Sequence, residues 1–500
     1  MLRDMARPKF FRDPVHGQLG YDAVDLALPP PSTSERPDAS LSWMVRNLID
    51  CPEFQRLRHI RQNGFVNFVY HGAEHSRFGH SMGVCHLARE MYQRIVRNMG
   101  EPIDPRRRLA TCSAALLHDI GHGPFSHVLE EILTSCGIPF SHEWMTRRLI
   151  LEAADTSPGM GGLRSTAQSV HATLSQIDSA FPNEVALYIS KKWRDAYNEQ
   201  HQLIDHWSYK IVSSQIDADR LDYLLRDAYF AGVKGHGFDL QRLLDMLHHL
   251  DHTRIAVHRR AIEPVEGYLL SLDQMYRTVY YHHTARAASV LLGCVLRRAF
   301  DLHKGGARDL FPSLGLDSRH PLAALFETGQ DVPLHDYLRL TDFHVFALIE
   351  EWQHHRDVVL ADLSRRLLGR ALFKAIDVDP RKYNTLQRLQ KRAEDLVRKH
   401  IAHVDRSTVQ YYVCVDEPER LSYKRYDWRN ENPDESIWIV DGTVGSSGSG
   451  NGSGLNDGAV PIEKEPSSII AALQTVKYFH RLMVPAEIRD QLLKESHLAS

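Results

Sequence analysis

Apolar residues recur at helical intervals along most of the chain between residues 42 and 378. The recurrence begins with Leu48, Phe54, Leu57 and Ile60. It continues in residues 80–97, 107–118, 206–229, 264–302 and 341–378. Residues three or four positions apart share one face of a helix, so these segments predict amphipathic helices around a common core. The fold class that we predict is mainly α, with a smaller α+β region near the C-terminus.

A few short stretches favour other structure. A DPVHG turn between apolar pieces predicts a hairpin over residues 8–26, and β-branched and aromatic residues predict strands at 407–416 and 437–440. A helical pattern returns at 467–479. Two composition-biased segments predict loops, of which the glycine- and serine-rich one should be flexible: residues 29–40 and 442–458.

The length of 500 residues exceeds the size at which one hydrophobic core usually stops growing. We therefore expect two or three structural units. The changes of pattern divide the chain into an N-terminal hairpin with a loop insertion (1–41), a helical core (42–300), a helical extension (301–400) and an α+β region (401–500).

The composition is that of an ordinary soluble globular protein, with 43% hydrophobic and 25% charged residues. The net charge of −3 does not favour a nucleic-acid partner, although it leaves room for a local basic patch. The six cysteines form no CxxC pair, which fits reduced thiols. Because the N-terminus lacks a signal peptide and no apolar stretch is long enough to span a bilayer, we expect a cytoplasmic protein without a membrane partner.

A histidine-rich turn follows the predicted helix over residues 107–118. It reads LLHDIGHGPFSH at 116–127, and His118 and Asp119 are adjacent within it. An imidazole and a carboxylate are suitable ligands for iron, manganese, zinc or magnesium, and neighbours at a helix end can lean toward one ion. Two ligands alone make a weak site, so a divalent metal needs further ligands from elsewhere in the chain.

Two other predicted helices offer those ligands. His80 opens one of them, and Arg77 precedes it by three residues on the same side. Another carries Asp219, Tyr223 and Asp227 on one face, opposite a row of leucines. Each feature alone has a structural explanation, since a buried histidine is more often a hydrogen-bonded core residue and a polar helix face is usually solvated. Their combination favours a metal site.

Six strings, in this order, carry a resemblance to a known family. The chain resembles the HD-domain phosphohydrolases, and more specifically the deoxynucleoside triphosphate (dNTP) triphosphohydrolases, whose antiviral animal member adds a SAM domain. The strings are DPVHG (13–17), CPEFQRLRHIRQNG (51–64), HSRFGHSMGV (75–84), HDIGHGPFSH (118–127), SHEW (141–144) and IDADRLDYLLRDA (216–228). The resemblance implies a helical HD core over residues 42–300, and we expect the bacterial type of the family, without a SAM domain.

The resemblance also implies a metal site and a reaction. The implied ligands of a divalent metal are His80, His118, Asp119 and Asp219. The implied reaction is attack of water at the α-phosphorus of a dNTP, which releases the deoxynucleoside and inorganic triphosphate. A metal lowers the pKa of bound water and offsets charge on the attacked phosphoryl group. The metal can be iron, manganese, magnesium or zinc, because mixed nitrogen and oxygen ligands suit all of these ions.

The same turn implies acid–base groups. His127 matches the family's proton donor, with Glu130 as its orienting carboxylate, while His122 and His142 match the other active-site histidines. A histidine can donate a proton near pH 7 because its ordinary pKa is about 6.5. Gly121 and Gly123 allow the tight backbone path that this crowding requires.

Further positions match residues that bind substrate or effector in the family. Arg77, Arg220 and Tyr223 match phosphate-facing residues, Asp227 matches the residue that meets the 3′-hydroxyl, and Tyr280 matches an aromatic beside the sugar. A core role explains Tyr280 nearly as well. The other implied substrate residues are Gln62 and Arg277, and the implied residues of a nucleotide-effector site between subunits are Asp50, Gln55, Arg56 and Arg58. A homo-oligomer, as a dimer, tetramer or hexamer, is therefore expected.

Two departures from the family keep other functions open. Leu272 stands where a second phosphate-binding arginine is expected, and Asn63 stands where a leucine meets the sugar. Besides a dNTPase in nucleotide-pool control or phage defence, the sequence is thus compatible with an HD hydrolase of an alarmone, a monophosphate, a cyclic nucleotide or a nucleic acid end. A nucleotide-sensing module with a silent site is the third reading.

Overall fold

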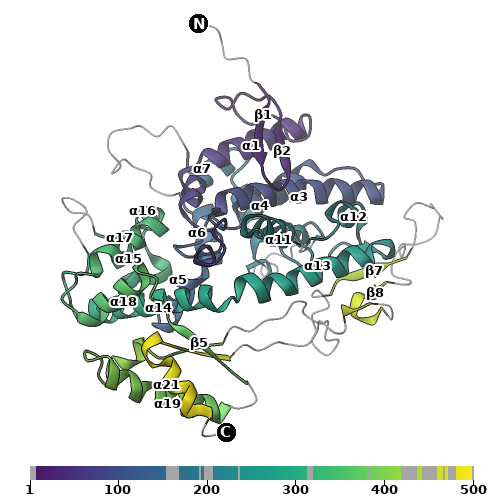
Figure 1. Cartoon of the computed structure of the whole chain (residues 1–500). Coiled ribbons are helices and arrows are strands. Elements are labelled where there is room, and N and C mark those ends of the chain that lie inside the picture. The colour runs from purple at the N-terminus through teal and green to yellow at the C-terminus, as the bar shows by residue number, and fades with distance from the viewer. Residues whose placement is uncertain are drawn as a thin grey trace.

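Helices make up most of the molecule (Figure 1). The computed structural model describes residues 7–153, 168–190, 193–195, 206–234, 237–311, 319–379, 383–417, 436–441, 459–465, 468–470 and 480–497. The α-helices are α1 (Pro37–Asp50), α2 (Pro52–Gln55), α3 (Arg77–Met99), α4 (Pro105–Leu117), α5 (His127–Ser135), α6 (His142–Leu151), α7 (Val170–Leu174), α8 (Phe181–Ile189), α10 (Tyr209–Val212), α11 (Ala218–Ala231), α12 (Leu240–Asp245), α13 (Ile262–Met275), α14 (His283–Lys304), α15 (Pro321–Thr328), α16 (Leu334–Arg339), α17 (Asp342–Trp352), α18 (Val358–Leu368), α19 (Tyr383–His400) and α21 (Ala486–His497).

The strands are short and form three small sheets. They are β1 (Lys9–Asp13), β2 (Gly17–Tyr21), β3 (Leu247–His249), β4 (Ile255–His258), β5 (Lys374–Val378), β6 (Cys414–Asp416), β7 (Trp438–Val440), β8 (Val460–Pro461) and β9 (His480–Val484). β1 and β2 pair as the expected antiparallel hairpin, and the other sheets have the orders β3-β4-β7-β8 and β5-β9-β6. The predicted fold class, mainly α with a smaller α+β region, is therefore confirmed.

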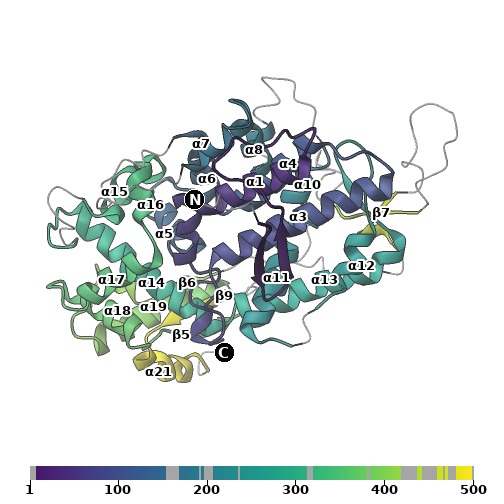
Figure 2. The same ribbon diagram turned by 90° about the horizontal axis from the view of Figure 1, so that it is seen from above.

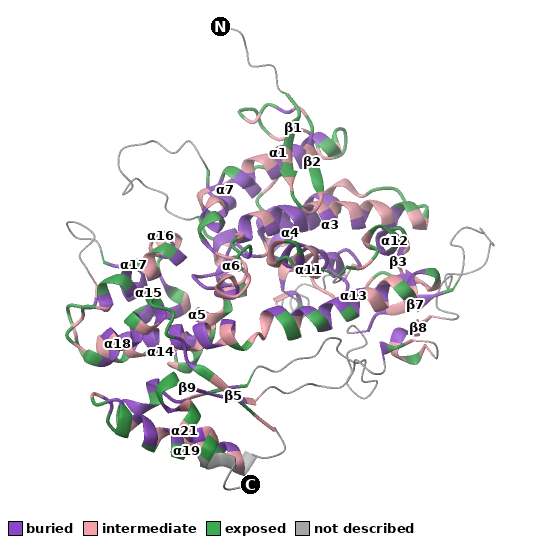
Figure 3. Cartoon of the chain, viewed as in Figure 1, coloured by how far each residue is buried: buried purple, intermediate pink, exposed green. Residues whose placement is uncertain are grey.

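The core is built around α4, which is buried on nearly all sides (Figure 3). Its small residues, such as Ala110 and Ala114, are fully buried and allow close approach of its neighbours α1, α3 and α8. α3 packs against both α4 and α11, and the β1–β2 hairpin lies across α3 and α11 (Figures 1 and 2). This arrangement brings the end of α4 and the starts of α3 and α11 together.

Several element boundaries differ from those that the sequence predicted. The segment 206–229 forms two helices, because the side chain of Asp217 caps a new helix by accepting the backbone N–H of Arg220 at 2.8 Å. The segment 264–302 is interrupted by a π-helical turn at Tyr276–Tyr280. α1 begins at Pro37, inside the segment predicted as a loop.

The C-terminal part holds the largest difference. The end of the predicted helical segment 341–378 is strand β5, which pairs antiparallel with β9 from the far end of the chain. Of residues 407–416, only 414–416 form a strand, whereas β7 confirms the strand predicted at 437–440. The predicted flexible run 442–458 and residues 471–479 lie outside the described residues. None of the described helices is both long and apolar enough to cross a membrane.

Candidate metal and active site

The four predicted metal ligands meet in space. His80 lies in the first turn of α3, His118 and Asp119 follow the end of α4, and Asp219 lies in the first turn of α11. Nε2 of His80 is 3.0 Å from Oδ1 of Asp219 and 3.7 Å from Oδ2 of Asp119. Nε2 of His118 is 3.3 Å from Oδ1 of Asp119 and 3.7 Å from Oδ1 of Asp219. Two imidazoles and two carboxylates therefore face one point.

The donor set fits a divalent cation. Nδ1 of His118 donates to the carbonyl of Ala115 at 2.8 Å, so Nε2 is the nitrogen that can offer a lone pair to a cation. That Nε2 is buried and has no hydrogen-bond partner among the residues that the structure describes. Ligand atoms of His80, His118 and Asp119 lie within 4.8 Å of one another. A buried acceptor facing two carboxylates is the environment that a cation would satisfy.

The electrostatics also favour a cation. Burial tends to lower the pKa of His80, but hydrogen bonds to Asp219 and Asp222 outweigh burial and raise that pKa to about 10. Burial tends to raise the pKa of Asp119, but the neighbouring Arg77 and His118 hold it well below its usual range. Asp119 is thus an anion at neutral pH, and its carboxylate attracts positively charged groups.

The backbone after the ligands is strained. Phe125 and Ser126 both have a φ of 55°, a region that residues other than glycine rarely adopt. Asp342 accepts the backbone N–H of Phe125 at 2.9 Å, and the hydroxyl of Ser126 accepts from Nε of Arg77 at 2.8 Å. These bonds offset strain of about 1–3 kcal/mol per residue. The strained turn places His127 at the start of α5, beside the metal ligands.

Close packing explains one glycine of this turn. A Cβ on Gly121 would lie 2.2 Å from the carbonyl oxygen of His142 and 2.2 Å from the backbone nitrogen of Thr146. The hydroxyl of Tyr337 donates to the carbonyl of Gly121 at 2.6 Å, and Arg56 donates to the carbonyl of His122 at 2.8 Å. The turn is therefore fixed on both sides by contacts that leave no room for a side chain at residue 121.

A second group of histidines lies next to the predicted metal ligands. The rings of His122 and His142 stack with their centroids 4.0 Å apart, and His122 Nε2 is 3.3 Å from Oδ1 of Asp119. Glu130 accepts from Nδ1 of His142 at 2.7 Å and lies 3.8 Å from Nδ1 of His127. The carboxylate that the sequence assigned to His127 thus orients His142 more closely.

Two pKa shifts define this group. Burial tends to raise the pKa of Glu130, but His127 and His142 outweigh it and lower the pKa to about 2. Burial and the charge of Arg77 hold the pKa of His122 well below its usual range. Glu130 is therefore ionised and His122 is neutral near pH 7. The ligand nitrogens of His122, His127 and His142 also lie within 4.8 Å of one another.

A polar cavity of about 780 Å³ opens beside these side chains. Asp227 accepts from Nε2 of His75 at 2.8 Å and from the hydroxyl of Tyr280 at 2.6 Å, so both of its oxygens are held in place. The predicted site residues that line the cavity are Gln62, Arg77, His118, Asp119, His122, His127, His142, Asp219, Arg220, Tyr223, Asp227 and Tyr280. The volume is in the range of small-molecule sites.

Some predicted residues lie elsewhere. Arg277 is outside the cavity lining, and its Nε is 2.7 Å from Oδ2 of Asp273. The guanidinium of Arg56 is buried and donates to carbonyls of the chain interior, so the structure does not present it to a ligand at the surface. Asp50 and Arg58 are exposed, and Arg58 donates to the side chain of Gln55 at 2.8 Å.

The sequence also missed one wall of the cavity. Arg286 on α14 and Glu417, just after β6, line it, and Arg286 is paired with Asp416 at 2.5 Å. A lone arginine within a long helix and two acidic residues at the end of a strand carry no local signal of a site. Only the pairing of α14 with the C-terminal region brings them together.

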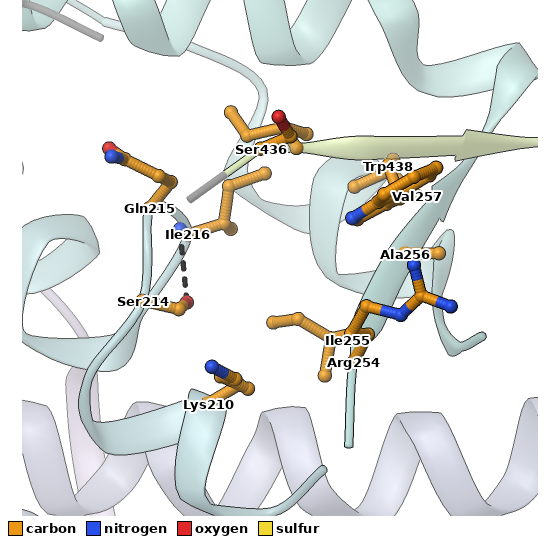
Figure 4. Close-up of a pocket in the computed structure, with 11 residues that line it drawn as sticks. Lys210, Ser214, Gln215, Ile216, Arg254, Ile255, Ala256, Val257, Ser436 and Trp438 are labelled. Carbon is orange, nitrogen blue, oxygen red and sulfur yellow. Dashed lines mark hydrogen bonds between the residues drawn. The ribbon is translucent and has the colours of Figure 1, made fainter. Parts of the chain in front are cut away.

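A smaller cavity lies between the segment 214–216 and strands β4 and β7 (Figure 4). Its volume of about 20 Å³ has room for a water molecule and not for a nucleotide. Lys210, Ser214 and Trp438 are among its lining residues, and the hydroxyl of Ser214 accepts the backbone N–H of Ile216 at 3.2 Å. The larger cavity is therefore the candidate active site.

A helical core that gathers histidines and aspartates into a group able to hold a cation is the arrangement of the HD-type hydrolases. Two family models match the chain: HD domain at residues 77–156 and HD associated region at residues 238–312. YwfO, an uncharacterized protein of Bacillus subtilis, is 34% identical over 426 residues, which cover 84% of this chain and 82% of YwfO. The chain belongs to the HD-domain phosphohydrolase family.

Other relatives agree with this assignment. The deoxynucleoside triphosphate triphosphohydrolase SAMHD1 of Gallus gallus is 29% identical over 300 residues, and the match covers 53% of this chain and 44% of that protein. A phosphohydrolase structure from Bacteroides thetaiotaomicron superimposes with a TM-score of 0.69 at 25% identity, covering 95% of this chain and 99% of the other. A hypothetical protein from Aquifex aeolicus shares the fold, with a TM-score of 0.63 at 23% identity.

Proposed function

We propose that this protein hydrolyses deoxynucleoside triphosphates to deoxynucleosides and inorganic triphosphate, with a divalent cation held by His80, His118, Asp119 and Asp219. The observation that carries the proposal is the convergence of these four side chains beside a cavity that three of them line, His118, Asp119 and Asp219. Arg77, Arg220 and a histidine group line the same cavity. The similarity to animal dNTP triphosphohydrolases supports the substrate class.

The cation and the chain have separate tasks in this proposal. When bound, a divalent cation lowers the pKa of a water molecule and offsets phosphate charge. Arg77 is buried and donates hydrogen bonds to Asp119 and to the hydroxyl of Ser126, so its guanidinium is fixed beside the proposed cation site. Arg220 is 31% exposed at its side chain, and Nη1 donates to Gln215 at 2.7 Å. A guanidinium that lines the cavity can donate a bidentate pair of hydrogen bonds to a polyphosphate.

His127 is the proposed donor of a proton to the leaving 5′-oxygen. Its side chain is 68% exposed toward the cavity that it lines, so it can approach a bound substrate. Glu130 is ionised near pH 7 and accepts a hydrogen bond from Nδ1 of His142, beside His127. Neutral His122 is positioned to accept or donate one hydrogen bond at the attacked phosphate.

The other end of the cavity suits a deoxyribose. Asp227 is fixed by His75 and Tyr280, which leaves its remaining lone pairs for a hydroxyl group of the ligand. Oε1 of Gln62 and Nδ2 of Asn63 are buried and have no hydrogen-bond partner within the described part of the chain. These two amides therefore offer one acceptor and one donor to a sugar or base.

One observation favours a second candidate substrate. Leu272 is only 2% exposed and packs in the core, so it cannot contribute to phosphate binding, and Arg277 lies outside the cavity. At the positions that match the family, the cavity thus has one arginine fewer for a triphosphate than expected, and Arg286, which also lines it, is paired with Asp416. Hydrolysis of another nucleotide, such as an alarmone, a monophosphate or a cyclic nucleotide, is the alternative, while a sensing module is not favoured because the ligand and acid–base side chains all converge.

Product analysis tests the proposal. The purified chain is incubated with each dNTP and NTP in the presence of iron, manganese or magnesium, and the products are identified by mass. Release of intact triphosphate and a deoxynucleoside supports the proposal. Release of phosphate or pyrophosphate supports the alternative. We further propose a homo-oligomer with a nucleotide effector near Asp50, Gln55 and Arg58, which size measurement with and without nucleotides tests.

A further inference from the structure

The DPVHG turn, which the proposed function leaves without a role, is built as a rigid support. Oδ1 of Asp13 accepts the backbone N–H groups of Val15 and His16, both at 2.9 Å, and closes the turn. Gly17 follows with a φ of +76°, which favours glycine. Oδ2 of Asp13 is 2.9 Å from Nη2 of Arg226, so the turn is anchored to α11.

The turn reaches the metal ligands through Asp222. This carboxylate is fully buried and contacts four donor nitrogens. Oδ1 accepts from Nε2 of His16 at 2.6 Å and from Nη2 of Arg226 at 2.9 Å. Oδ2 accepts from Nδ1 of His80 at 2.8 Å and from Nε of Arg226 at 2.7 Å. Each oxygen therefore accepts two hydrogen bonds, which is the full capacity of an ionised carboxylate.

This arrangement fixes which nitrogen of His80 carries a proton. An ionised carboxylate only accepts hydrogen bonds, so Nδ1 of His80 must be the protonated nitrogen. Nε2 then faces Asp119 and Asp219, and it becomes a metal ligand when a cation displaces its proton. A histidine that ligates a metal commonly donates its other ring nitrogen to a carboxylate, which sets the tautomer and the ring orientation.

The packing of α3 against α11 makes room for this carboxylate. A Cβ on Gly83 would lie 1.9 Å from Oδ1 of Asp222 and 2.5 Å from Nη2 of Arg226. Gly83 lies one helical turn after His80 in α3, so the same face of the helix carries the ligand and leaves the space for the group that orients it.

From these contacts we propose that Asp222 and His16 are positioning residues that orient His80 for metal binding, and that the DPVHG turn is the outer part of the metal centre. The inference rests on the proposed metal site, and it adds residues that neither touch the cation nor line the cavity. It also gives the N-terminal hairpin a function, because the hairpin supplies His16 and the anchor of Arg226.

Metal titration of the full chain tests the inference. Metal-depleted protein is titrated with Mn²⁺, followed by electron paramagnetic resonance of the free ion, and with Co²⁺, followed by its visible absorption. We expect Asp222→Asn to weaken Mn²⁺ binding about 10- to 100-fold, because the amide NH₂ group of asparagine would face the N–H donors that Asp222 accepts from. We expect His16→Ala to weaken binding by less, and His16→Gln, whose amide can still donate to Asp222, to restore it.

A matched control separates orientation from general damage to the fold. Asp362 on α18 also pairs with an arginine four residues on, at 2.8 Å, and lies 3.5 Å from a histidine, His403, but no predicted ligand is near it. Asp362→Asn should leave Mn²⁺ affinity unchanged. If Asp222→Asn does not fold, the Mn²⁺ affinities of His16→Ala and His16→Gln are compared instead, and they test the proposed positioning role of the turn.

The outcomes separate this inference from the proposed metal site. Wild-type affinity in Asp222→Asn and His16→Ala, together with loss of binding in His80→Ala, would overturn the inference and keep the site. Unchanged Mn²⁺ binding in His80→Ala would overturn the site itself. The Co²⁺ spectrum provides a second reading, because an altered ligand orientation changes its visible bands even where the affinity is retained.

Discussion

Nε2 of His80 on α3 lies 3.0 Å from Oδ1 of Asp219 on α11, and this contact joins two helices that are far apart in the sequence. Because His118 and Asp119 at the end of α4 face the same point, three helices of the core share one centre. The helical packing that stabilises the fold therefore also builds the candidate metal site.

The ligands should be individually essential for metal binding. His118→Ala or Asp219→Ala removes one donor from a set of four, so each variant should lose stoichiometric Mn²⁺ binding and hydrolysis while keeping its helical circular dichroism. Equilibrium dialysis with metal analysis measures the binding. A variant that retains one Mn²⁺ per chain and full turnover would show that its residue is not a ligand.

His127 should act in chemistry and not in metal binding. His127→Asn removes the proposed proton donor, so kcat should fall by about 10²–10⁴ with Mn²⁺ affinity unchanged. Steady-state kinetics beside metal titration separates the two effects. An equal loss of Mn²⁺ affinity would instead assign His127 to a metal site with His122 and His142.

The two predicted arginines should differ. Arg220 lines the cavity and Arg277 does not. Arg220→Ala should raise KM for the nucleotide about 10- to 100-fold, because it removes a charged pair of hydrogen bonds. Arg277→Ala should change KM little. Kinetics of both variants at several nucleotide concentrations measures the difference. The reverse ranking would place the phosphates elsewhere.

Gly121 should tolerate no side chain. Gly121→Ala puts a Cβ against the backbone of α6, and overpacking of this kind costs about 1–3 kcal/mol of unfolding free energy. Gly237 is a control, because a Cβ added there meets nothing within 4 Å. Urea denaturation of the two alanine variants should show a loss only at residue 121, and equal stability would contradict the packing described above.

Below neutrality, the free energy of unfolding should decrease as the pH decreases, and His320 contributes to this decrease. Burial, together with the charges of His344 and Arg339, lowers the pKa of His320 to about 4, while Nδ1 accepts the backbone N–H of Leu322 as a helix cap. Between pH 4 and an unfolded pKa of about 6.5, only the unfolded chain binds this proton, so stability is lost as pH falls through that window.

His320→Asn should reduce this dependence, because asparagine caps a helix without titrating. Denaturant unfolding at pH 7 and pH 5 measures it: the variant should lose less stability than the wild type on acidification. An identical loss in both proteins would show that His320 takes no part.

The convergence of the four proposed ligands could be predicted because they lie in recognisable strings. The adjacency of His118 and Asp119, and the place of Asp219 on the polar face of a helix, are local features that the sequence shows without knowledge of the packing. The roles of His16 and Asp222 were not predicted, although DPVHG was recognised, because the contact between a hairpin turn and α11 is a property of the tertiary fold.

The fold differed from expectation where distant segments compete with local preference. Residues 374–378 continue a helical pattern in the sequence, yet they form β5 because β9 supplies its hydrogen-bond partners from the end of the chain. Arg286 is a comparable case in the site: only its partner Asp416, on β6, places it at the cavity wall. The periodicity of apolar residues within one segment contains no information on partners from distant segments.

The most direct test of the central claim is the position of a bound cation. Crystals of the full chain grown with Mn²⁺ are measured by anomalous diffraction near the manganese edge. We predict a peak between Nε2 of His80, Nε2 of His118 and the carboxylates of Asp119 and Asp219. A peak only among His122, His127 and His142, or no peak at either group, would contradict the account.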